Sequence, residues 1–584
     1  MRDLTVIVYS SGTTPLQNDA GSELLRATGV DFETMYPAGL YGAASFFIAR
    51  DVLDCLAVKV GMRVEIWDDL DWVYEGHIIN INYTVSRERS GVEVNCVGPW
   101  AYRLMQYALR KRWVDNRFND DAWQPETTAQ FDKFTLDRSN RLRFLPKQGV
   151  SYAANDVVYW RYDMPTGQTI KRVTFDYNLQ EGAQDWGLTL YNIDAASVIW
   201  NVNVSGSGSR DETLATPSNG IWFYFNSGAA QTGIGDGTIH ATITNLRVYS
   251  ETGNINMYEI FGDVVDELST AGYLNSSKSL LQQSGSPLSL VPFMADDFEN
   301  IADILAEAAG RGDANYDAWG YGLKHSRRAQ TYDGKSLLFL EPYPDTSDYD
   351  ITVGLDERPP LISPVRFRFA TEHVLNWITL RFDNAQGRSV FRSPLNNALL
   401  KDDASISTYG RRAPKSPLYL GDSTTTIADT FGRKVLSRYK DGRWELRSSL
   451  TLMDQVRTKN QRHLPVSKVE AGMRIRIENF IEDVIFLISA TRYSQQDDVV
   501  TLQAGLPISL LMPRYMHPEL EEEATTGESG GAEPGAQPGW HSWSKRKKYV
   551  RFGRSLGYTW SRWLGLSAQE MNRLIRAEKQ RRRR

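Results

Sequence analysis

The chain has 584 residues, 41% of them hydrophobic and 23% charged, and a formal net charge of −5. This length predicts roughly three to five domains, and the composition is that of a soluble globular protein, which excludes a largely disordered chain. No apolar run approaches the roughly 20 residues of a membrane span, and the N-terminus lacks the apolar core of a signal peptide, so we expect assembly in a cytoplasm.

The first 114 residues are predicted to form a β-domain. Residues 64–67 and 72–78 suit a hairpin, and residues 91–98 alternate apolar and polar side chains with the period of a half-buried strand. A short helix over residues 100–109 should follow Pro99. The chain's two cysteines, Cys55 and Cys96, lie among apolar neighbours, which predicts buried thiols rather than a disulfide or a metal-binding pair.

Residues 115–255 are predicted to form an all-β insert. Segments rich in Trp, Tyr, Val and Thr alternate with Gly, Asn, Asp and Ser turns at the spacing of a β-sandwich. At least six strands are expected, over residues 157–162, 172–178, 186–191, 198–204, 220–226 and 240–249. A jelly-roll-like sandwich, similar to a carbohydrate-binding module, fits this pattern best.

Residues 256–360 introduce helices into the β-rich chain. Apolar residues at helical spacing from 260 to 268 predict one helix that ends before Gly272. A second helix is expected to begin at a cap formed by Asp296 or Asp297 and to end at Gly310. Its buried stripe is predicted to contain Phe298, Ile301, Ile304, Leu305 and Ala308. A hairpin through Gly334 should then join residues 319–323 to residues 336–341.

Residues 361–515 are predicted to form a second β-domain. One helix, over residues 426–439, interrupts segments that alternate as strands do. These segments are residues 374–382, 473–477, 484–491 and 499–504. Because strands lie on both sides of the insert, residues 1–114 and 256–515 are expected to belong to one body.

The composition changes twice beyond residue 515. Residues 516–539 are acidic, rich in Gly and Pro and without apolar anchors, which predicts a flexible linker. Residues 540–584 are basic and rich in Trp, with a net charge of about +12 against about −17 for the rest of the chain. A capping box at residues 567–570 predicts a terminal helix.

We expect this basic terminal segment to dock on a neighbouring partner protein, because several tryptophans are costly to leave in water. A nucleic acid and an anionic membrane surface are the alternative partners. The candidate docking residues are Trp543, Lys545, Arg546, Lys547, Lys548, Trp560 and Trp563.

The sequence contains no constellation typical of an enzyme. Its seven histidines stand far apart, and there is no His-Glu-x-x-His, Cys-x-x-Cys, Gly-x-Ser-x-Gly, phosphate-binding loop or dinucleotide fingerprint. Carboxylate pairs such as Glu65 and Glu75 occur, but proximity alone does not specify the geometry of a glycosidase. We therefore predict a protein that is not an enzyme, with no catalytic residues, no cofactor and no metal.

The aromatic residues of the insert allow two interpretations. Trp160, Trp186 and Trp222 are candidates for glycan binding, because an aromatic ring can present a flat apolar face to a sugar. Aromatic residues at alternating strand positions more often fill the core of a sandwich, and this packing interpretation is favoured.

Four stretches outside the insert carry a resemblance. The first leads from residues 36–50 into Gly61-Met-Arg-Val-Glu-Ile-Trp67 and Tyr74-Glu-Gly-His-Ile-Ile79, and the second is the predicted helical pair. The third is Trp319-Gly-Tyr-Gly-Leu323 with Leu337-Leu-Phe-Leu-Glu-Pro342, and the fourth runs from Leu375-Asn-Trp-Ile-Thr-Leu-Arg-Phe382 through Val469-Glu-Ala-Gly-Met-Arg-Ile-Arg-Ile477 to Gly505. In their order these modules resemble the baseplate hub and tail-associated (tail tip) proteins of long-tailed bacteriophages.

The resemblance implies a mainly β, multidomain fold: an α+β hub body with tube-like β-barrel domains, plus the inserted jelly-roll-like β-sandwich. It divides the chain into a first hub β-domain (1–114), the insert (115–255), a helical and β hub domain (256–360), a second tube-like β-domain (361–515), the linker (516–539) and the basic segment (540–584).

The function that the resemblance implies is structural. Such a protein continues or caps the tail tube of the virion, connects it to the distal tip or receptor-binding parts, and forms a homotrimer whose six tube-like domains match a hexameric tube. Its partners would be the tail tube or distal tail protein and other tail tip proteins, and DNA would pass through without specific binding. Because a DNA conduit must repel phosphates, we expect part of the acidic excess to line the lumen.

Two further hypotheses come from other classes of function. One is a glycan-binding adhesin that acts through the insert on a host cell-surface glycan, and the other is a glycoside hydrolase. Some relatives of the hub family carry a peptidoglycan hydrolase at the C-terminus, where this chain has only the linker and the basic segment. A ring-forming trimer would favour the hub, whereas a monomer that binds polysaccharide would favour the adhesin.

Overall fold

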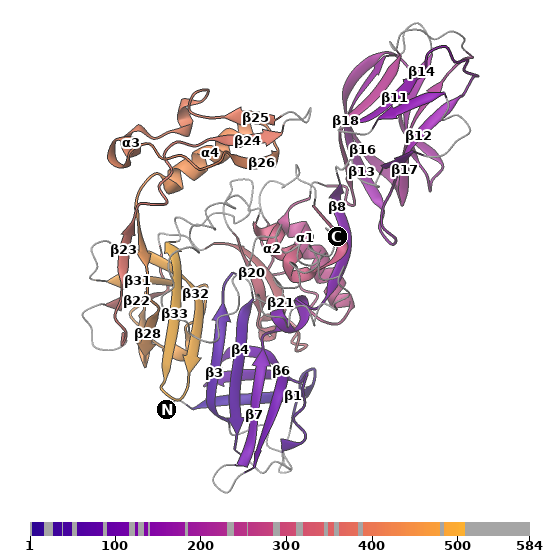
Figure 1. The fold of residues 1–584 in the computed structure, drawn as a ribbon. Coiled ribbons are helices and arrows are strands. Elements are labelled where there is room, and N and C mark those ends of the chain that lie inside the picture. The colour runs from indigo at the N-terminus through magenta and orange to yellow at the C-terminus, as the bar shows by residue number, and fades with distance from the viewer. Residues whose placement is uncertain are drawn as a thin grey trace, which may run out of the picture. The chain divides into compact units, whose positions relative to one another are not determined.

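The computed structural model describes part of a chain that divides into two units, residues 1–516 and 517–584. All of the described residues belong to the first unit, so the predicted basic terminal segment lies outside them. They are residues 3–16, 27–37, 39–49, 55–85, 90–115, 123–125, 133–137, 141–180, 185–230, 239–253, 255–283, 293–310, 319–343, 348–354, 361–383, 389–478 and 484–507. The predicted fold class, mainly β with several sheets, is confirmed (Figure 1).

The largest sheet joins the two ends of the described chain. Its order is β2 (Thr14–Pro15), β1 (Leu4–Ser11), β5 (Arg63–Asp68), β6 (Asp71–Val85), β7 (Ser90–Val97), β4 (Leu40–Ile48), β3 (Ala27–Met35), β32 (Ile485–Ser494), β31 (Arg474–Glu478), β22 (Ile351–Gly354), β29 (Gln455–Thr458) and β30 (His463–Pro465). β33 (Val499–Pro507) pairs with β32 and with β28 (Leu450–Met453). The predicted hairpin at residues 64–78 is confirmed as the antiparallel pair β5–β6.

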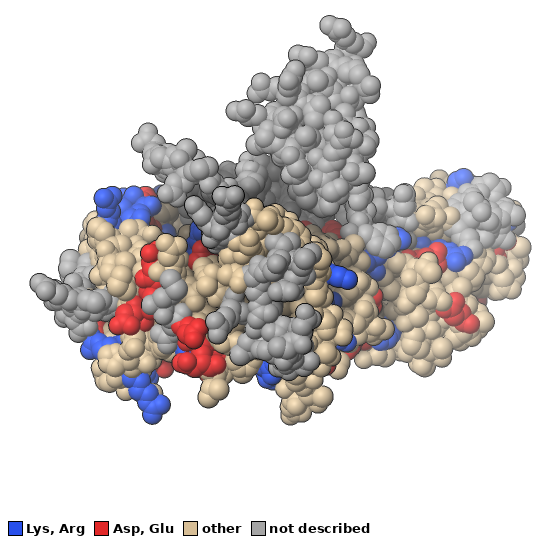
Figure 2. Space-filling view, turned by 90° about the horizontal axis from the view of Figure 1, so that it is seen from below, with Lys and Arg blue, Asp and Glu red and all other residues tan. Residues whose placement is uncertain are grey.

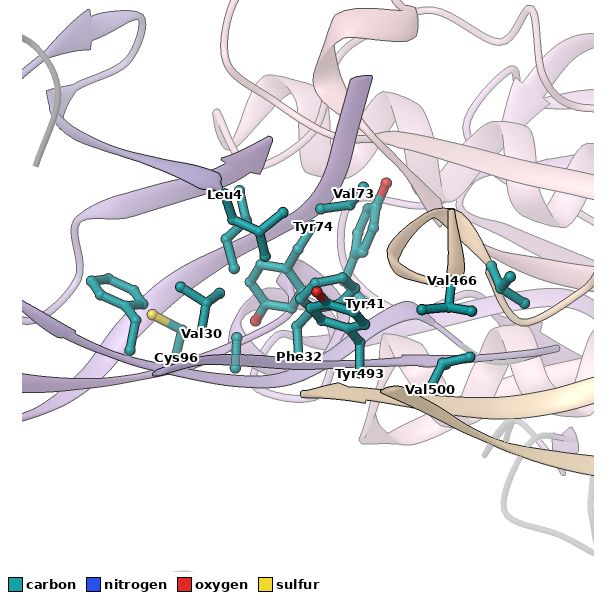
Figure 3. Close-up of a cluster of buried hydrophobic side chains, with 14 of the residues drawn as sticks. Leu4, Val30, Phe32, Tyr41, Val73, Tyr74, Cys96, Val466, Tyr493 and Val500 are labelled. Carbon is teal, nitrogen blue, oxygen red and sulfur yellow. The ribbon is translucent and has the colours of Figure 1, made fainter. Parts of the chain in front are cut away.

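One hydrophobic core lies along this sheet and draws residues from both ends of the chain. Val6, Val64 and Val94 belong to it together with Ile475 and Val500. Apolar residues at every second position of these strands produce this arrangement, because successive side chains of a strand point to opposite faces. Figure 3 shows Phe32, Tyr74 and Tyr493 gathered in the middle of the core. Both cysteines are buried thiols that form no disulfide, as predicted.

The insert consists of two sheets around a core of its own. One sheet has the order β15 (Ser197–Val202), β14 (Trp186–Asn192), β17 (Gly220–Ser227), β12 (Val157–Asp163) and β9 (Trp123–Pro125). The other has the order β10 (Phe134–Asp137), β11 (Leu142–Pro146), β18 (His240–Tyr249), β13 (Ile170–Gln180) and β16 (Gly206–Ser218). Phe175 and Phe223, whose ring centroids are 5.0 Å apart, join the two sheets inside the core.

The six strands predicted for the insert are present, but β9, β10 and β11 were not predicted, and neither was the longer β16. Its sequence, GSGSRDETLATPS, lacks apolar alternation because most of its residues are exposed at the edge of the sheet. β8 (Ala108–Asp115) and β19 (Phe293–Asn300) extend the same sheet, since β8 pairs with both β18 and β19. The helix predicted over residues 100–109 is wrong in length: a π-helical turn ends at Leu104, and β8 begins at Ala108.

The chain enters and leaves the insert at neighbouring positions. Val114 pairs with Tyr249, and the backbone N–H of Ser250 donates to the carbonyl of Trp113 at 3.2 Å.

Excision of the insert by joining Asp115 to Asn256 should therefore leave a soluble, folded protein. Circular dichroism and thermal melting of the excised chain test this expectation, and an insoluble product would count against the predicted boundary at residues 115 and 255.

A second core surrounds the helical part. It contains side chains of α1 (Met257–Thr270) and α2 (Ile301–Gly310), and of the hairpin β20 (Trp319–Lys324) and β21 (Leu337–Pro342). Asn256 begins α1 with a capping box that includes Glu259, which satisfies backbone N–H groups of the first turn.

The prediction that Asp296 or Asp297 caps the second helix is wrong. β19 occupies residues 293–300 and pairs with β8, so Phe298 belongs to a strand rather than to the helical stripe. The Oδ1 atom of Asn300 instead accepts the backbone N–H of Asp303 at 2.8 Å and caps α2. The rest of the predicted stripe is correct, because Ile301, Ile304, Leu305 and Ala308 are buried.

Residues 361–450 form short strands and helices. They are β23 (Phe367–Ala370), β24 (Leu380–Asp383), β25 (Ser389–Arg392), α3 (Asp403–Tyr409), β26 (Leu418–Asp422), α4 (Thr425–Tyr439) and β27 (Arg443–Leu446). Helix α4 confirms the prediction at residues 426–439, but the strand predicted over residues 374–382 begins only at Leu380. The preceding N–H groups of Asn376 and Trp377 both donate to the carbonyl of Arg412, which holds that segment as a loop.

Candidate functional site

The predicted site residues fall into two groups. The candidate docking residues between Trp543 and Trp563 lie outside the described residues, and their role stays a prediction. In the insert, Trp186 is fully buried and Trp160 is 3% exposed, so both rings fill the sandwich core and neither can offer a face to a ligand. Trp222 points the other way and is partly exposed. This placement removes Trp160 and Trp186 from the candidate glycan-binding set.

β3 and β32 pair with each other and join the two ends of the described chain. We call this pairing the seam. Residues 31–35 pair antiparallel with residues 490–494, more than 450 positions away in sequence. The buried hydroxyls of Thr34 and Thr491 lie 2.6 Å apart, and the Thr34 hydroxyl also accepts the N–H of Ala471. The side-chain oxygen of Gln495 accepts the backbone N–H of Val30, and the backbone N–H of Gln495 donates to the carbonyl of Val30. Backbone hydrogen bonds between the paired strands and side-chain hydrogen bonds therefore both hold the seam together.

A buried charge cluster lies between β5, β6 and residues 325–336. Arg63 is its centre: the guanidinium is 2.6 Å from Glu65 and 3.0 Å from Glu75, and it also donates to Ser326 and Tyr332. Arg63 is 6% exposed and the two glutamates are fully buried. The cluster therefore ties the hairpin β5–β6 to a segment more than 250 residues further on.

The carboxylate of Glu65 accepts hydrogen bonds from five groups. Burial by itself would raise its pKa, but the charge of Arg63 and the donors around the carboxylate lower the pKa to about 2. These donors are Arg63, Tyr332, Tyr9, Trp67 and Arg327. Glu65 therefore stays ionised, and its oxygens are already occupied by the protein's own donors.

Glu75 holds the other side of the cluster. One of its oxygens accepts from Arg63, and the other accepts the backbone N–H of Ser326 at 2.9 Å. His325, which is fully buried, lies 4.0 Å from Glu75 and stacks on Trp72. Burial lowers the pKa of His325, against the attraction of the two glutamates. The carboxylates of the cluster are bound by Arg63 and by backbone groups. The cluster therefore acts as a clamp that holds the hairpin β5–β6 against residues 325–336.

Glu65 and Glu75 were predicted as a carboxylate pair, but the parts played by Arg63, His325 and Tyr332 were not predicted. On β5 the apolar residues Val64 and Ile66 enter the main core, so period-2 alternation predicts a solvated face for Arg63 and Glu65. Residues 325–336 cover that face instead. The signal in the sequence was the number of charged residues in this one short hairpin, which occur at positions facing inward as well as outward.

The described residues hold no group of three or more His, Cys, Asp or Glu side chains arranged to bind a metal ion. Within the same residues, none of the helices combines the length and the apolar character needed to cross a membrane. Acidic and basic side chains both occur on the face drawn in Figure 2.

No family model and no curated protein matches this chain. Among solved structures, a tail protein from Neisseria meningitidis is 9% identical with a TM-score of 0.39, and the likeness covers 87% of this chain and 98% of that one. The 43 kDa tail protein of prophage MuSo2 from Shewanella oneidensis is 10% identical with a TM-score of 0.38, covering 87% and 100%. A family 29 carbohydrate-binding module is 12% identical over 24% of this chain and 93% of its own, with a TM-score of 0.17. At such scores these likenesses assign no function.

Proposed function

We propose that this chain is a structural, non-enzymatic component of a phage tail, a baseplate hub or tail tip protein. In this role it continues or caps the tail tube and connects the tube to the distal tip or receptor-binding parts. The order of modules in the sequence suggests the family, and the observation that carries the proposal is the pairing of β3 with β32. That pairing makes one continuous sheet from two β-rich parts at opposite ends of the described chain.

The two β-domains of a tube-forming subunit must be held at a fixed angle to each other. A ring closes only if every subunit is rotated relative to its neighbour by the same angle. The seam provides such a fixed connection, through a shared core and a hydrogen-bonded ladder. In the proposed homotrimer, three chains with two β-domains each supply six domains around the tube axis.

The proposed partners are the tail tube or distal tail protein on one side of the ring and other tail tip proteins on the other. DNA would pass through the ring without specific binding, which an acidic lumen supports by repelling phosphates. The basic terminal segment, reached through the linker, would dock on a neighbouring tail protein. The protein is thus proposed to be part of the virion, located at the tail tip and assembled in the host cytoplasm.

Electron microscopy of virions labelled with an antibody against the insert tests the proposed place in the particle. We expect the label at the end of the tail distant from the head. Particles that carry the chain on the head or along the whole tube, or that lack it altogether, would contradict the proposal.

A further inference from the structure

The outward face of the five-stranded sheet of the insert carries four aromatic side chains. On β12, β14 and β17 the residues of one parity enter the core, as Trp160 and Phe223 do. The residues of the other parity point away from the core. They include Tyr159, Tyr191, Trp222 and Tyr224, each of which is partly exposed. We call these four residues the aromatic row.

The members of the row touch one another across three neighbouring strands. Tyr191 and Trp222 are register partners of β14 and β17, and their rings are nearly parallel, 5.6 Å apart at an interplanar angle of 12°. The ring of Tyr159, from β12, lies 5.2 Å from that of Trp222 and 6.0 Å from that of Tyr224. These contacts fix the rings relative to one another, so the row is a preformed apolar surface rather than a set of independent side chains.

The sheet under the row is almost free of charge. Its five strands contain only Arg161 and Asp163 among charged residues, and the Nε atom of Arg161 donates to both oxygens of Asp163, at 3.0 and 2.9 Å. Gln124 and Asn226 add amide groups to the same face. The opposite sheet differs, with Arg172 paired to Asp211 on its own strands.

A glycine shapes the surface next to the row. A Cβ atom at Gly187 would lie 2.7 Å from the Oδ1 atom of its register partner Asn226, which is closer than such atoms approach. Glycine at this position therefore leaves room for the Asn226 amide on the outward face. Rigid aromatic rings flanked by amides and hydroxyls combine apolar contact with groups that can both donate and accept hydrogen bonds.

We infer that the aromatic row is a binding site for an uncharged polysaccharide. A sugar ring presents apolar C–H faces that pack on aromatic rings, and hydroxyls that bond to amide and hydroxyl side chains. The charge of the face matches this ligand: a nucleic acid or an acidic polysaccharide needs unpaired basic groups, and here Arg161 already shares its charge with Asp163. The inference concerns the insert alone and holds whether or not the body is a tail subunit.

Isothermal titration of the full-length chain with hexamers of glucose, mannose and N-acetylglucosamine tests the inference. We expect at least one of these neutral hexamers to bind, and Trp222→Ala to raise its Kd by roughly tenfold or more through loss of the central ring. Tyr191→Ala serves as a second variant if Trp222→Ala fails to fold, as judged by its thermal melt. Tyr83→Ala, which removes a 47% exposed ring from β6, is the matched control and should bind like the original chain.

Three results would overturn the inference. One is that none of the neutral hexamers binds, and another is that the row variants bind as tightly as the control. The third is preferential binding of heparin or single-stranded DNA, included as anionic probes, because the face would then be selecting charge rather than apolar sugar faces.

Discussion

Replacement of Arg63 by methionine should lower the free energy of unfolding by about 3–5 kcal/mol, the cost of breaking a buried ion pair. The variant leaves Glu65 and Glu75 buried without the guanidinium that contacts both. It also removes donors to Ser326 and Tyr332, which fasten the distant segment to β5. Chemical denaturation followed by tryptophan fluorescence gives the difference.

The matched control is Arg492→Met. Arg492 is 69% exposed and lies 3.9 Å from Glu33, so its loss should change stability by less than about 1 kcal/mol. If Arg63→Met is as stable as this control, the Arg63 cluster is not a clamp.

The same cluster predicts how stability depends on pH. The pKa of Glu65 in the folded chain is about 2, below its ordinary 4.5, so its contribution is fully present above pH 4.5 and is lost as the pH falls towards 2. Arg63→Met removes the main charge that lowers this pKa. The variant should therefore lose less stability than the original chain over that window.

Phe32→Ala should cost about 3–5 kcal/mol, as for other large-to-small changes at buried aromatic positions. Phe32 lies at the seam, 2% exposed, with its ring 5.1 Å from that of Tyr493 and 6.2 Å from that of Tyr74. Because it packs against both ends of the chain, its loss should also weaken the coupling of the two β-rich parts. Calorimetry should then show the unfolding transition broaden or divide.

Phe369→Ala, at a 46% exposed position of β23, is the control and should leave one sharp transition. A Phe32→Ala protein that melts with the same profile as this control would mean that the seam does not couple the two parts.

Local patterns in the sequence predicted much of the fold. Alternation located the hairpin β5–β6 and the six insert strands, and helical spacing located α1 and α4. The failures came where long-range pairing decides the structure. Residues 293–300 form a strand because β8 lies beside them, which no local pattern around Asp296 indicates. Residues 376 and 377 stay in a loop because the backbone carbonyl of Arg412 accepts both of their N–H groups.

The candidate sites were harder to predict for the same reason. Trp160 and Trp222 both lie on strands of one sheet, but they point to opposite faces, and the register that decides between core and surface is set by partner strands. The Arg63 cluster depends on coverage by residues 325–336, far away in sequence. The predicted domain boundaries and the role of the basic terminal segment stay predictions.

The mass of the purified full-length chain in solution tests the proposed tail role most directly. Native mass spectrometry should give three times the 66.2 kDa of one chain, and electron-microscopic class averages should show a threefold ring. A chain that remains a 66.2 kDa monomer, with no ring in the images, would contradict the account.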